Sequence, residues 1–128
     1  MKSIANHIQT HADALNLRSK RNEILASNIV NSATPNFKAR DIDFNQALQA
    51  RMDVGPVNVS NERHFKFYTG SGDEAAQFRQ SINPSVDGNT VELHVEQMQF
   101  SENVMRYQTS LEFLNRKFSG LVSAIKGE

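Results

Sequence analysis

The residue types that most often carry chemistry in proteins are present in this chain, but they are not grouped as a metal site needs. His7 and His11 are four residues apart, which is the spacing of two metal ligands on one helix face. The residue after His7 is Ile8, where a metalloprotease H-E-x-x-H motif has its glutamate, and no third ligand lies close in sequence. We therefore expect both histidines to lie on the face of a helix as ordinary surface residues, and we expect no metal site.

Two aspartates, Asp41 and Asp43, are close enough in sequence to form a pair of carboxylates. Asp43 is better explained as the cap of a helix, because Gln46 follows three residues later in a capping-box arrangement. The sequence contains no Gly-x-Ser-x-Gly elbow, P-loop or dinucleotide fingerprint, and residues 70–72 lack the lysine of a phosphate-binding loop. We therefore expect no catalytic residue, no cofactor and no small-molecule substrate.

The charges of the chain balance, with 14 lysines and arginines against 14 aspartates and glutamates. A neutral chain has no long-range attraction to nucleic acid or to anionic lipid, so we expect neither as a partner. The absence of cysteine excludes disulfides, thiolate metal sites and cysteine nucleophiles. Only 38% of the residues are hydrophobic, which is lean for 128 residues that must bury their own core. Part of the order of this chain should therefore come from partners.

Apolar residues are spaced along the chain and nowhere contiguous. No run of 18 apolar residues occurs, so we expect no membrane-spanning segment. The first 20 residues lack the hydrophobic region of a cleavable signal peptide. If the protein leaves the cytoplasm, we expect it to do so by another route.

Residues 3 to about 32 are predicted to form one long amphipathic helix. The helix cannot continue further, because Pro35 restricts the conformation of the residue before it. Leu17, Ile24 and Asn28 form a second, narrower stripe. The five asparagines of this helix either make a solvated face or fix the register of a helix contact, and the sequence leaves both interpretations open. The main apolar face consists of Ile4, Ile8, Ala12, Leu15, Ala26 and Ile29.

A short helix over residues 44–52 is predicted to follow, with Phe44 and Leu48 four residues apart on one side. Residues 53–88 are rich in turn signals, such as Gly55-Pro56 and Asp87-Gly88. Stretches of alternating residues around Val57 and Phe65 are too short for an independent sheet. We therefore expect a turn-rich, weakly structured middle region.

The strongest periodicity lies in residues 89–128. Asn89 can cap a helix there, with Glu92 three residues later, and Gly127 stands where a C-terminal cap belongs. Between these caps apolar residues recur at alternating spacings of three and four, which is a coiled-coil seam. The seam consists of Leu93, Gln97, Phe100, Val104, Tyr107, Leu111, Leu114, Phe118, Leu121 and Ile125.

These elements predict an all-α protein in which two long terminal helices pair as an antiparallel coiled coil, with Ile8 and Leu15 facing the seam. The single domain would have three parts: residues 1–52, 53–88 and 89–128. Such a pair would cover one seam of each helix, and exposed apolar stripes usually find partners. The periodicity thus indicates oligomerisation through the residues left open, which are Leu17, Ile24, Val95, Met98 and Met105.

The stretch from Leu25 to Lys38 reads L-A-S-N-I-V-N-S-A-T-P-N-F-K. It closely resembles L-A-x-N-I-A-N-x-x-T-P-G-Y-K, the signature shared by flagellar rod and hook proteins. Val30, Asn36 and Phe37 depart from it, but Asn36 can keep the turn of the usual glycine because asparagine tolerates the left-handed conformation. The residues that carry the resemblance are Leu25, Ala26, Asn28, Ile29, Asn31, Thr34, Pro35, Phe37 and Lys38.

Residues 38–44, 87–91 and 107–125 resemble, more narrowly, the proximal rod members of this family. The short middle region fits as well, since hook and distal rod relatives carry a larger inserted domain. The resemblance implies a structural subunit of the periplasmic rod in the flagellar basal body, and not an enzyme. Such subunits stack helically with themselves and with other rod proteins to form the drive shaft and export channel, with the paired terminal helices innermost.

The resemblance also implies further partners. They are the adapter that joins the rod to the membrane ring, the membrane ring itself, and the flagellar type III apparatus that exports the unfolded subunit. Rod and hook subunits carry a Phe, three arbitrary residues and an apolar residue, a pattern linked to recognition by the export gate. Phe44 and Leu48 match this pattern, although they could equally pack the short helix onto the long ones. A helical adaptor or type III secretion chaperone is the alternative function, which would explain the helices but not the signature.

Overall fold

The computed structural model describes the backbone of residues 2–53, 76–83 and 85–127, and the side chains of residues 8–52, 76–83 and 85–127. Two long helices dominate: α1 (Lys2–Val30) has 29 residues and α3 (Leu93–Lys126) has 34. The predicted all-α class is therefore confirmed. The alternating stretches around Val57 and Phe65 lie outside the described residues. The remaining elements are β1 (Arg40–Ile42), α2 (Phe44–Asp53) and β2 (Ala76–Phe78).

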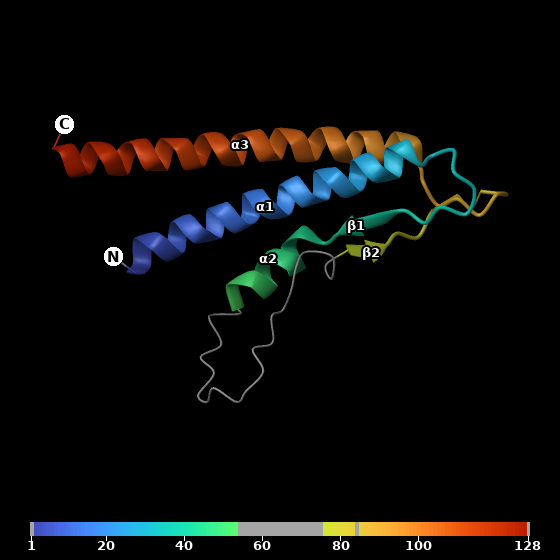
Figure 1. The fold of residues 1–128 in the computed structure, drawn as a ribbon, viewed down its shortest axis with the longest axis horizontal. Helices are drawn as coiled ribbons and strands as arrows, with labels where there is room; N and C mark the ends of the chain where they lie inside the picture. The colour runs from blue at the N-terminus through green and yellow to red at the C-terminus, as the bar shows by residue number, and fades with distance from the viewer. Residues whose placement is uncertain (1, 54–75, 84, 128) are drawn as a thin grey trace, which may run out of the picture.

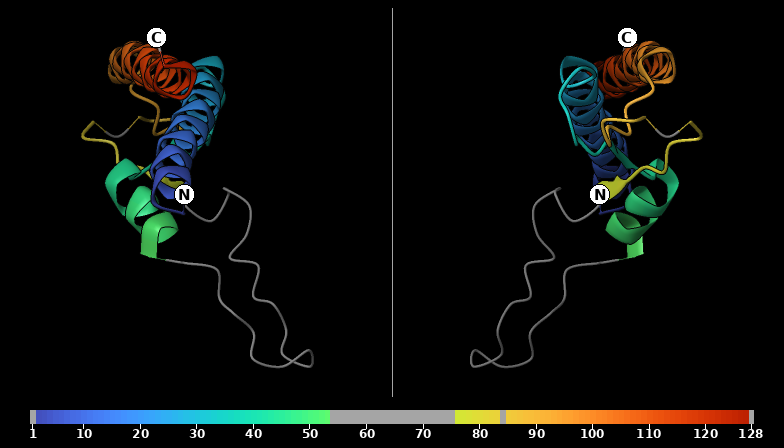
Figure 2. Two further views of the ribbon diagram at one scale, coloured as in Figure 1. Left: turned by 90° about the vertical axis from the view of Figure 1, so that its left-hand side faces the viewer. Right: turned by 90° about the vertical axis from the view of Figure 1, so that its right-hand side faces the viewer.

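The two long helices run antiparallel, as predicted, and α1 lies between α3 on one side and α2 with the two strands on the other (Figures 1 and 2). They meet near the turn that follows α1 and diverge toward the chain ends (Figure 1). Burial follows the same course: among the described side chains, none of α1 before Leu17 and none of α3 after Asn103 is buried. The contact between the helices is thus concentrated at one end. None of the helices in the described ranges is long and apolar enough to cross a membrane.

Local signals place most of the helix ends correctly. α1 ends at Val30, just ahead of the predicted turn, and Asn36 adopts the left-handed conformation with φ 59°, as expected from its substitution for glycine. Asp43 caps α2, because its Oδ1 accepts the backbone N–H of Gln46 at 3.1 Å. Gly127 closes α3 with φ 75°, and its N–H donates to the Ser123 carbonyl at 3.0 Å.

A small antiparallel ribbon of β1 and β2 was not predicted. Arg40 pairs with Phe78 and Ile42 with Ala76, and the N–H of Arg79 continues the pairing by donating to the Ala39 carbonyl at 2.9 Å. Strands of three residues are too short to show an alternating pattern in the sequence. The ribbon brings residue 79 from the far side of the middle region back to the start of α3.

The predicted cap of α3 is wrong. The helix begins at Leu93, its N-cap position is Glu92, and no side-chain hydrogen bond caps it. Asn89 lies outside the helix, where its side chain serves the turn after α1 instead.

Where the structure describes side chains, the buried core contains as many polar as apolar residues. Leu17, Leu25, Ala39 and Ile42 are its apolar members among the described residues, and its polar members are Asn28, Asn89, Glu96 and Asn103. Leu17 and Asn28 belong to the stripe of α1 that was expected to be the minor one, so that expectation is wrong for α1. Ile8 and Leu15 are only half-buried.

Three parallel rows of residues on α3 describe how this helix packs. The shared row, which is half-buried apart from its first residue, consists of Leu93, Phe100, Tyr107, Leu114 and Leu121. The polar row flanks it on the side toward α1 and consists of Glu96, Asn103, Ser110 and Lys117. The outer row flanks it on the opposite side and consists of Gln97, Val104, Leu111, Phe118 and Ile125.

The predicted seam had the shared row and the outer row facing α1. In the structure, the shared row and the polar row face α1 instead. The seam is therefore wrong as a contact between α1 and α3 at Leu93, Leu111, Phe118 and Ile125, which are exposed. The polar row and the outer row are one residue apart, which is about 100° around the helix axis. Exchanging one row for the other beside the shared row shifts the centre of the contact face by half of this angle. The helix is therefore rotated about its axis by about 50° from the predicted orientation. Met98 and Met105 are exposed, as expected.

Candidate functional site

The signature residues form the turn that ends α1. The side chain of Asn31 donates to the Ser27 carbonyl at 2.8 Å and accepts the Thr34 hydroxyl at 3.1 Å, so it holds both sides of the turn. The backbone N–H of Phe37 donates to the Thr34 carbonyl at 3.3 Å. These short-range bonds explain why Asn and Thr occur at these two positions, because both side chains readily bond to nearby backbone groups.

Asn89 joins this turn to the segment before α3. It is 4% exposed, and its Nδ2 group donates to the carbonyls of Asn31, Ser32 and Thr34 at 3.1, 2.9 and 2.9 Å. These three carbonyls belong to the turn that follows Val30, the last residue of α1. Asn89 satisfies these carbonyls from a segment more than 50 residues away in sequence.

The two segments are further joined side by side. Asn36 donates its N–H to the Asp87 carbonyl at 3.0 Å, and Lys38 donates its ammonium group to the Gly88 carbonyl at 2.6 Å. Gly88 has φ 76°, a left-handed conformation that favours glycine, and a Cβ at this position would come within 2.6 Å of Asn36 Oδ1 and displace that side chain. The signature turn and residues 87–90 therefore form one structural unit, which we call the elbow.

Asn28 connects α1 to β1 and α3. Its Oδ1 accepts the N–H of Arg40 at 3.1 Å, and its Nδ2 donates to the Arg40 carbonyl at 2.6 Å. The amide group thus pairs with both backbone groups of Arg40, as the backbone of a neighbouring strand does in a sheet. The same Nδ2 donates to Glu96 Oε2 at 3.0 Å. Of the two interpretations of the α1 asparagines, a role in a helix contact applies to Asn28.

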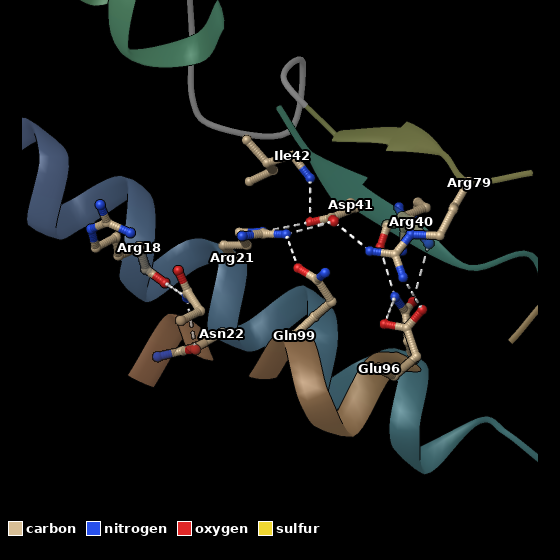
Figure 3. Close-up of polar contacts among 11 residues, drawn as sticks. Arg18, Arg21, Asn22, Arg40, Asp41, Ile42, Arg79, Glu96 and Gln99 are labelled. Atoms are coloured by element: carbon tan, nitrogen blue, oxygen red, sulfur yellow. Dashed lines mark hydrogen bonds and ion pairs between the residues drawn. The ribbon is translucent and has the colours of Figure 1, made fainter. Parts of the chain in front are cut away.

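A charge cluster adjoins Asn28, in which Asp41 lies between Arg21 and Arg79 (Figure 3). Arg21 contacts the two carboxylate oxygens of Asp41 at 2.8 and 2.9 Å, the bidentate geometry in which Arg binds carboxylates most strongly. Arg79 contacts Asp41 with Nη2 and the fully buried Glu96 with Nη1, at 2.5 and 2.6 Å. The cluster holds two positive and two negative groups and links α1, β1, the end of β2 and α3.

The environment of Asp41 favours its charged form. Burial acts to raise the pKa of Asp41, but hydrogen bonds from Arg21 and from the N–H of Ile42 outweigh it and hold the pKa below its usual value. The hydrogen bond to Asp41 likewise raises the pKa of Arg21, against the opposing effect of burial.

We expect this charge cluster to make the folded chain sensitive to acid. A carboxyl group whose pKa is lowered in the folded state stabilises that state above its unfolded pKa of about 3.9, and the stabilisation disappears as the pH falls further. The variant Asp41→Asn should lose about 2 kcal/mol of unfolding free energy at pH 7 and show a shallower decline between about pH 5 and pH 3. Circular dichroism with urea at several pH values measures this difference. Equal slopes for both proteins would show that Asp41 does not contribute.

Asn103 makes a second polar contact between the long helices, one that sequence reasoning did not single out. Its Nδ2 donates to the Arg18 carbonyl and to Asn22 Oδ1, both at 2.8 Å. The residue is 0% exposed, and its Oδ1 has no hydrogen-bond partner within the described part of the chain. A buried oxygen without a partner costs free energy, so this asparagine is not the most stable choice for the position.

The outer row of α3 is an apolar surface that no part of the described chain covers fully. Leu111 is 39% exposed, Phe118 46% and Ile125 84%, although they recur at a heptad spacing like core residues. Their role as assembly residues stays a prediction, together with that of the shared row. Apolar residues at heptad spacing are the residues through which helices pack in coiled coils, so the outer row has the geometry to contact another long helix.

Phe44 and Leu48, the export pair, are half-buried on α2. The guanidinium carbon of Arg18 lies 4.1 Å from the centre of the Phe44 ring, which is a cation–π contact. Phe44 therefore packs α2 against α1 in the folded chain. This contact accounts for the packing interpretation and leaves export recognition as a prediction.

Of the two histidines at metal-ligand spacing, only His11 has a described side chain. His11 packs edge-on against Phe113, with ring centres 5.1 Å apart, and the side chain of His7 lies outside the described residues. Where side chains are described, no group of three His, Cys, Asp or Glu residues could hold a metal ion.

Known proteins share the sequence of this chain well beyond the signature. Residues 8–38 match the family model of flagella basal body rod proteins. A protein of Cereibacter sphaeroides, flagellar basal body rod protein FlgB, is 50% identical over 100% of both chains. FlgB of Aeromonas hydrophila is 47% identical over 92% of this chain and 91% of that protein. FlgB of Escherichia coli strain K12 is 36% identical, with 89% and 88% of the two chains covered.

Proposed function

The chain belongs to the FlgB family of flagellar basal body rod proteins, and from this premise we propose that it joins its neighbours in the rod through the outer row of α3. It is a structural subunit of the rod, and neither the family match nor the relatives favour a helical adaptor or a secretion chaperone. As a member of this family it assembles with other components of the basal body. We propose no catalytic, metal-binding or cofactor-binding role for any of its residues.

The observation that carries the proposal is a heptad row of apolar residues in which Leu111, Phe118 and Ile125 are exposed and Val104 is half-buried. Val104, Leu111, Phe118 and Ile125 lie one to a heptad on one side of a 34-residue helix. A surface of this shape and length is complementary to another long helix, and this chain supplies two of them. The occupant we propose is a terminal helix of a second copy of this chain. Contacts of this head-to-tail kind generate helical filaments when the rotation does not close into a ring.

Leu111 and Leu114 provide a matched pair of positions to test this surface. Leu111→Asp should change the unfolding free energy of the isolated chain by less than about 0.5 kcal/mol, because Leu111 is already exposed, but it should abolish motility. Leu114→Asp should lose motility and also destabilise the chain by about 2 kcal/mol, because Leu114 is half-buried against α1. Urea unfolding and swimming assays measure the two effects. A motile strain carrying Leu111→Asp would contradict the proposed surface.

We further propose the finer placement of the subunit. It would lie in the proximal, periplasmic part of the rod, beside the other rod proteins and the adapter that joins the rod to the membrane ring. The paired terminal helices would form the inner layer around the export channel, and the parts 1–52, 53–88 and 89–128 would act as one domain. The family signature residues would serve to build the elbow, as the bonds of Asn31 and Thr34 support, and to join α1 to β1 and α3, as the bonds of Asn28 support.

Export through the flagellar type III apparatus, without a cleavable signal peptide, is also part of the proposal. Because Phe44 packs beneath Arg18 in the folded chain, recognition of Phe44 and Leu48 would have to precede folding. In cells that lack the wild-type copy, Phe44→Ala with Leu48→Ala should leave the protein in the cytoplasm, as fractionation would measure. Normal export combined with absent rods would instead assign the pair to packing alone.

A further inference from the structure

The orientation of α3 is not the one that apolar burial alone would choose. The shared row can face α1 together with either of two flanking rows. The outer row offers Val104, Leu111, Phe118 and Ile125, whereas the polar row offers Glu96, Asn103, Ser110 and Lys117. Burying the outer row would remove more apolar surface from water, which is the dominant favourable contribution to folding. The structure nevertheless places the polar row against α1.

Two residues of the polar row hold this orientation through specific bonds. Glu96 is 0% exposed and binds Arg79 at 2.6 Å and Asn28 at 3.0 Å. Asn103, one heptad further on, binds the Arg18 carbonyl and Asn22 of α1. A rotation of about 50° about the helix axis would carry both side chains away from these partners and would leave a buried charge unpaired.

We propose that Glu96 and Asn103 are specificity-determining residues that keep α3 rotated so that the outer row remains available to a second copy of this chain. The inference rests on the proposed function, because it assumes that the outer row is an assembly surface. Single buried polar residues fix register and oligomeric state in coiled coils at a cost in stability. Asn103 fits this description, because its Oδ1 has no partner among the described residues. The chain gives up intramolecular burial and gains a surface for its neighbours.

The test replaces Asn103 by leucine and follows the rotation with single cysteines, which the chain otherwise lacks. Ser110→Cys reports on the polar row and Leu111→Cys on the outer row. Labelling by a maleimide is timed for each thiol in the isolated chain, with trimethylamine N-oxide present to favour the compact state. With Asn103 in place, the thiol at position 111 should react faster than the thiol at position 110.

With Asn103→Leu, the thiol at position 110 should gain reactivity relative to the thiol at position 111, with the ratio changing about tenfold, the shift expected from losing two net hydrogen bonds. The unfolding free energy should stay equal or rise, while rods and motility are lost. Simple destabilisation would have a different signature, because unfolding makes both thiols react faster. Asn103→Ala should shift the ratio in the same direction by a smaller factor. This variant replaces Asn103→Leu in the experiment if the leucine side chain does not fit at position 103.

The matched control is Gln108→Leu, which adds the same side chain to an exposed position of α3 that lies on none of the three rows. It should leave the thiol ratio and motility unchanged. An unchanged ratio in Asn103→Leu, or equal reactivity of the two thiols with Asn103 in place, would overturn the inference. The proposed function is tested separately, and it would fail if rods assemble from the Leu111→Asp variant. The two failures can be distinguished because the thiol experiment uses only the isolated chain.

Discussion

Replacing Asn89 by aspartate is expected to destabilise the elbow by about 3 kcal/mol. Asparagine and aspartate have nearly the same shape, but aspartate has no N–H to donate. The change would place a buried negative charge against the carbonyls of Asn31, Ser32 and Thr34, which now accept from Asn89. Helix content against urea or trimethylamine N-oxide concentration, followed by circular dichroism, measures the loss, and cells carrying this variant should not swim.

Asn115→Asp is the matched control for this change, because Asn115 is exposed on α3. It should alter the unfolding free energy by less than about 0.5 kcal/mol. If both substitutions had equally small effects, the bonds of Asn89 to the signature turn would not stabilise the protein.

Arg79→Gln is expected to have the second large effect, again about 3 kcal/mol, because it leaves Glu96 buried without its ion-pair partner. Urea unfolding followed by circular dichroism at pH 7 measures the loss.

The double variant Arg79→Gln with Glu96→Gln removes the buried charge and should recover part of the stability. Arg116→Gln is the control for arginine removal, because the pair of Arg116 with Glu112 is exposed and contributes little. Additive losses in the double variant would mean that Arg79 and Glu96 are not coupled.

The features that the sequence predicts well are those that depend on neighbouring residues. Pro35 and Asn36 mark the end of α1, Asp43 the start of α2 and Gly127 the end of α3, because capping and turn preferences act over a few residues. The antiparallel pairing of the long helices follows from their length and amphipathic character. Of the shared row that the periodicity placed in the seam, Phe100, Tyr107, Leu114 and Leu121 are half-buried and Leu93 is exposed.

The features that the sequence misses depend on partners far away in the chain. Asn89 followed by Glu92 has the pattern of a capping box, yet the asparagine serves carbonyls 55 to 58 residues earlier. The rotation of α3 depends on Glu96 with Asn28, 68 residues apart, and on Asn103 with Arg18, 85 residues apart. A periodicity argument weighs only apolar positions, so it selects the outer row. The available signal was that Glu96 and Asn103 stand seven residues apart beside an apolar row, as polar residues that fix register do.

A cryo-EM map of basal bodies from the bacterium that makes this chain would test most directly whether α3 joins subunits of the rod through its outer row. The map should contain the chain in the rod, with Val104, Leu111, Phe118 and Ile125 packed against a helix of a neighbouring copy. Glu96 and Asn103 should still face α1 of their own chain. A rod in which the outer row faces solvent, or in which Glu96 and Asn103 form the contact between subunits, would contradict the proposed assembly.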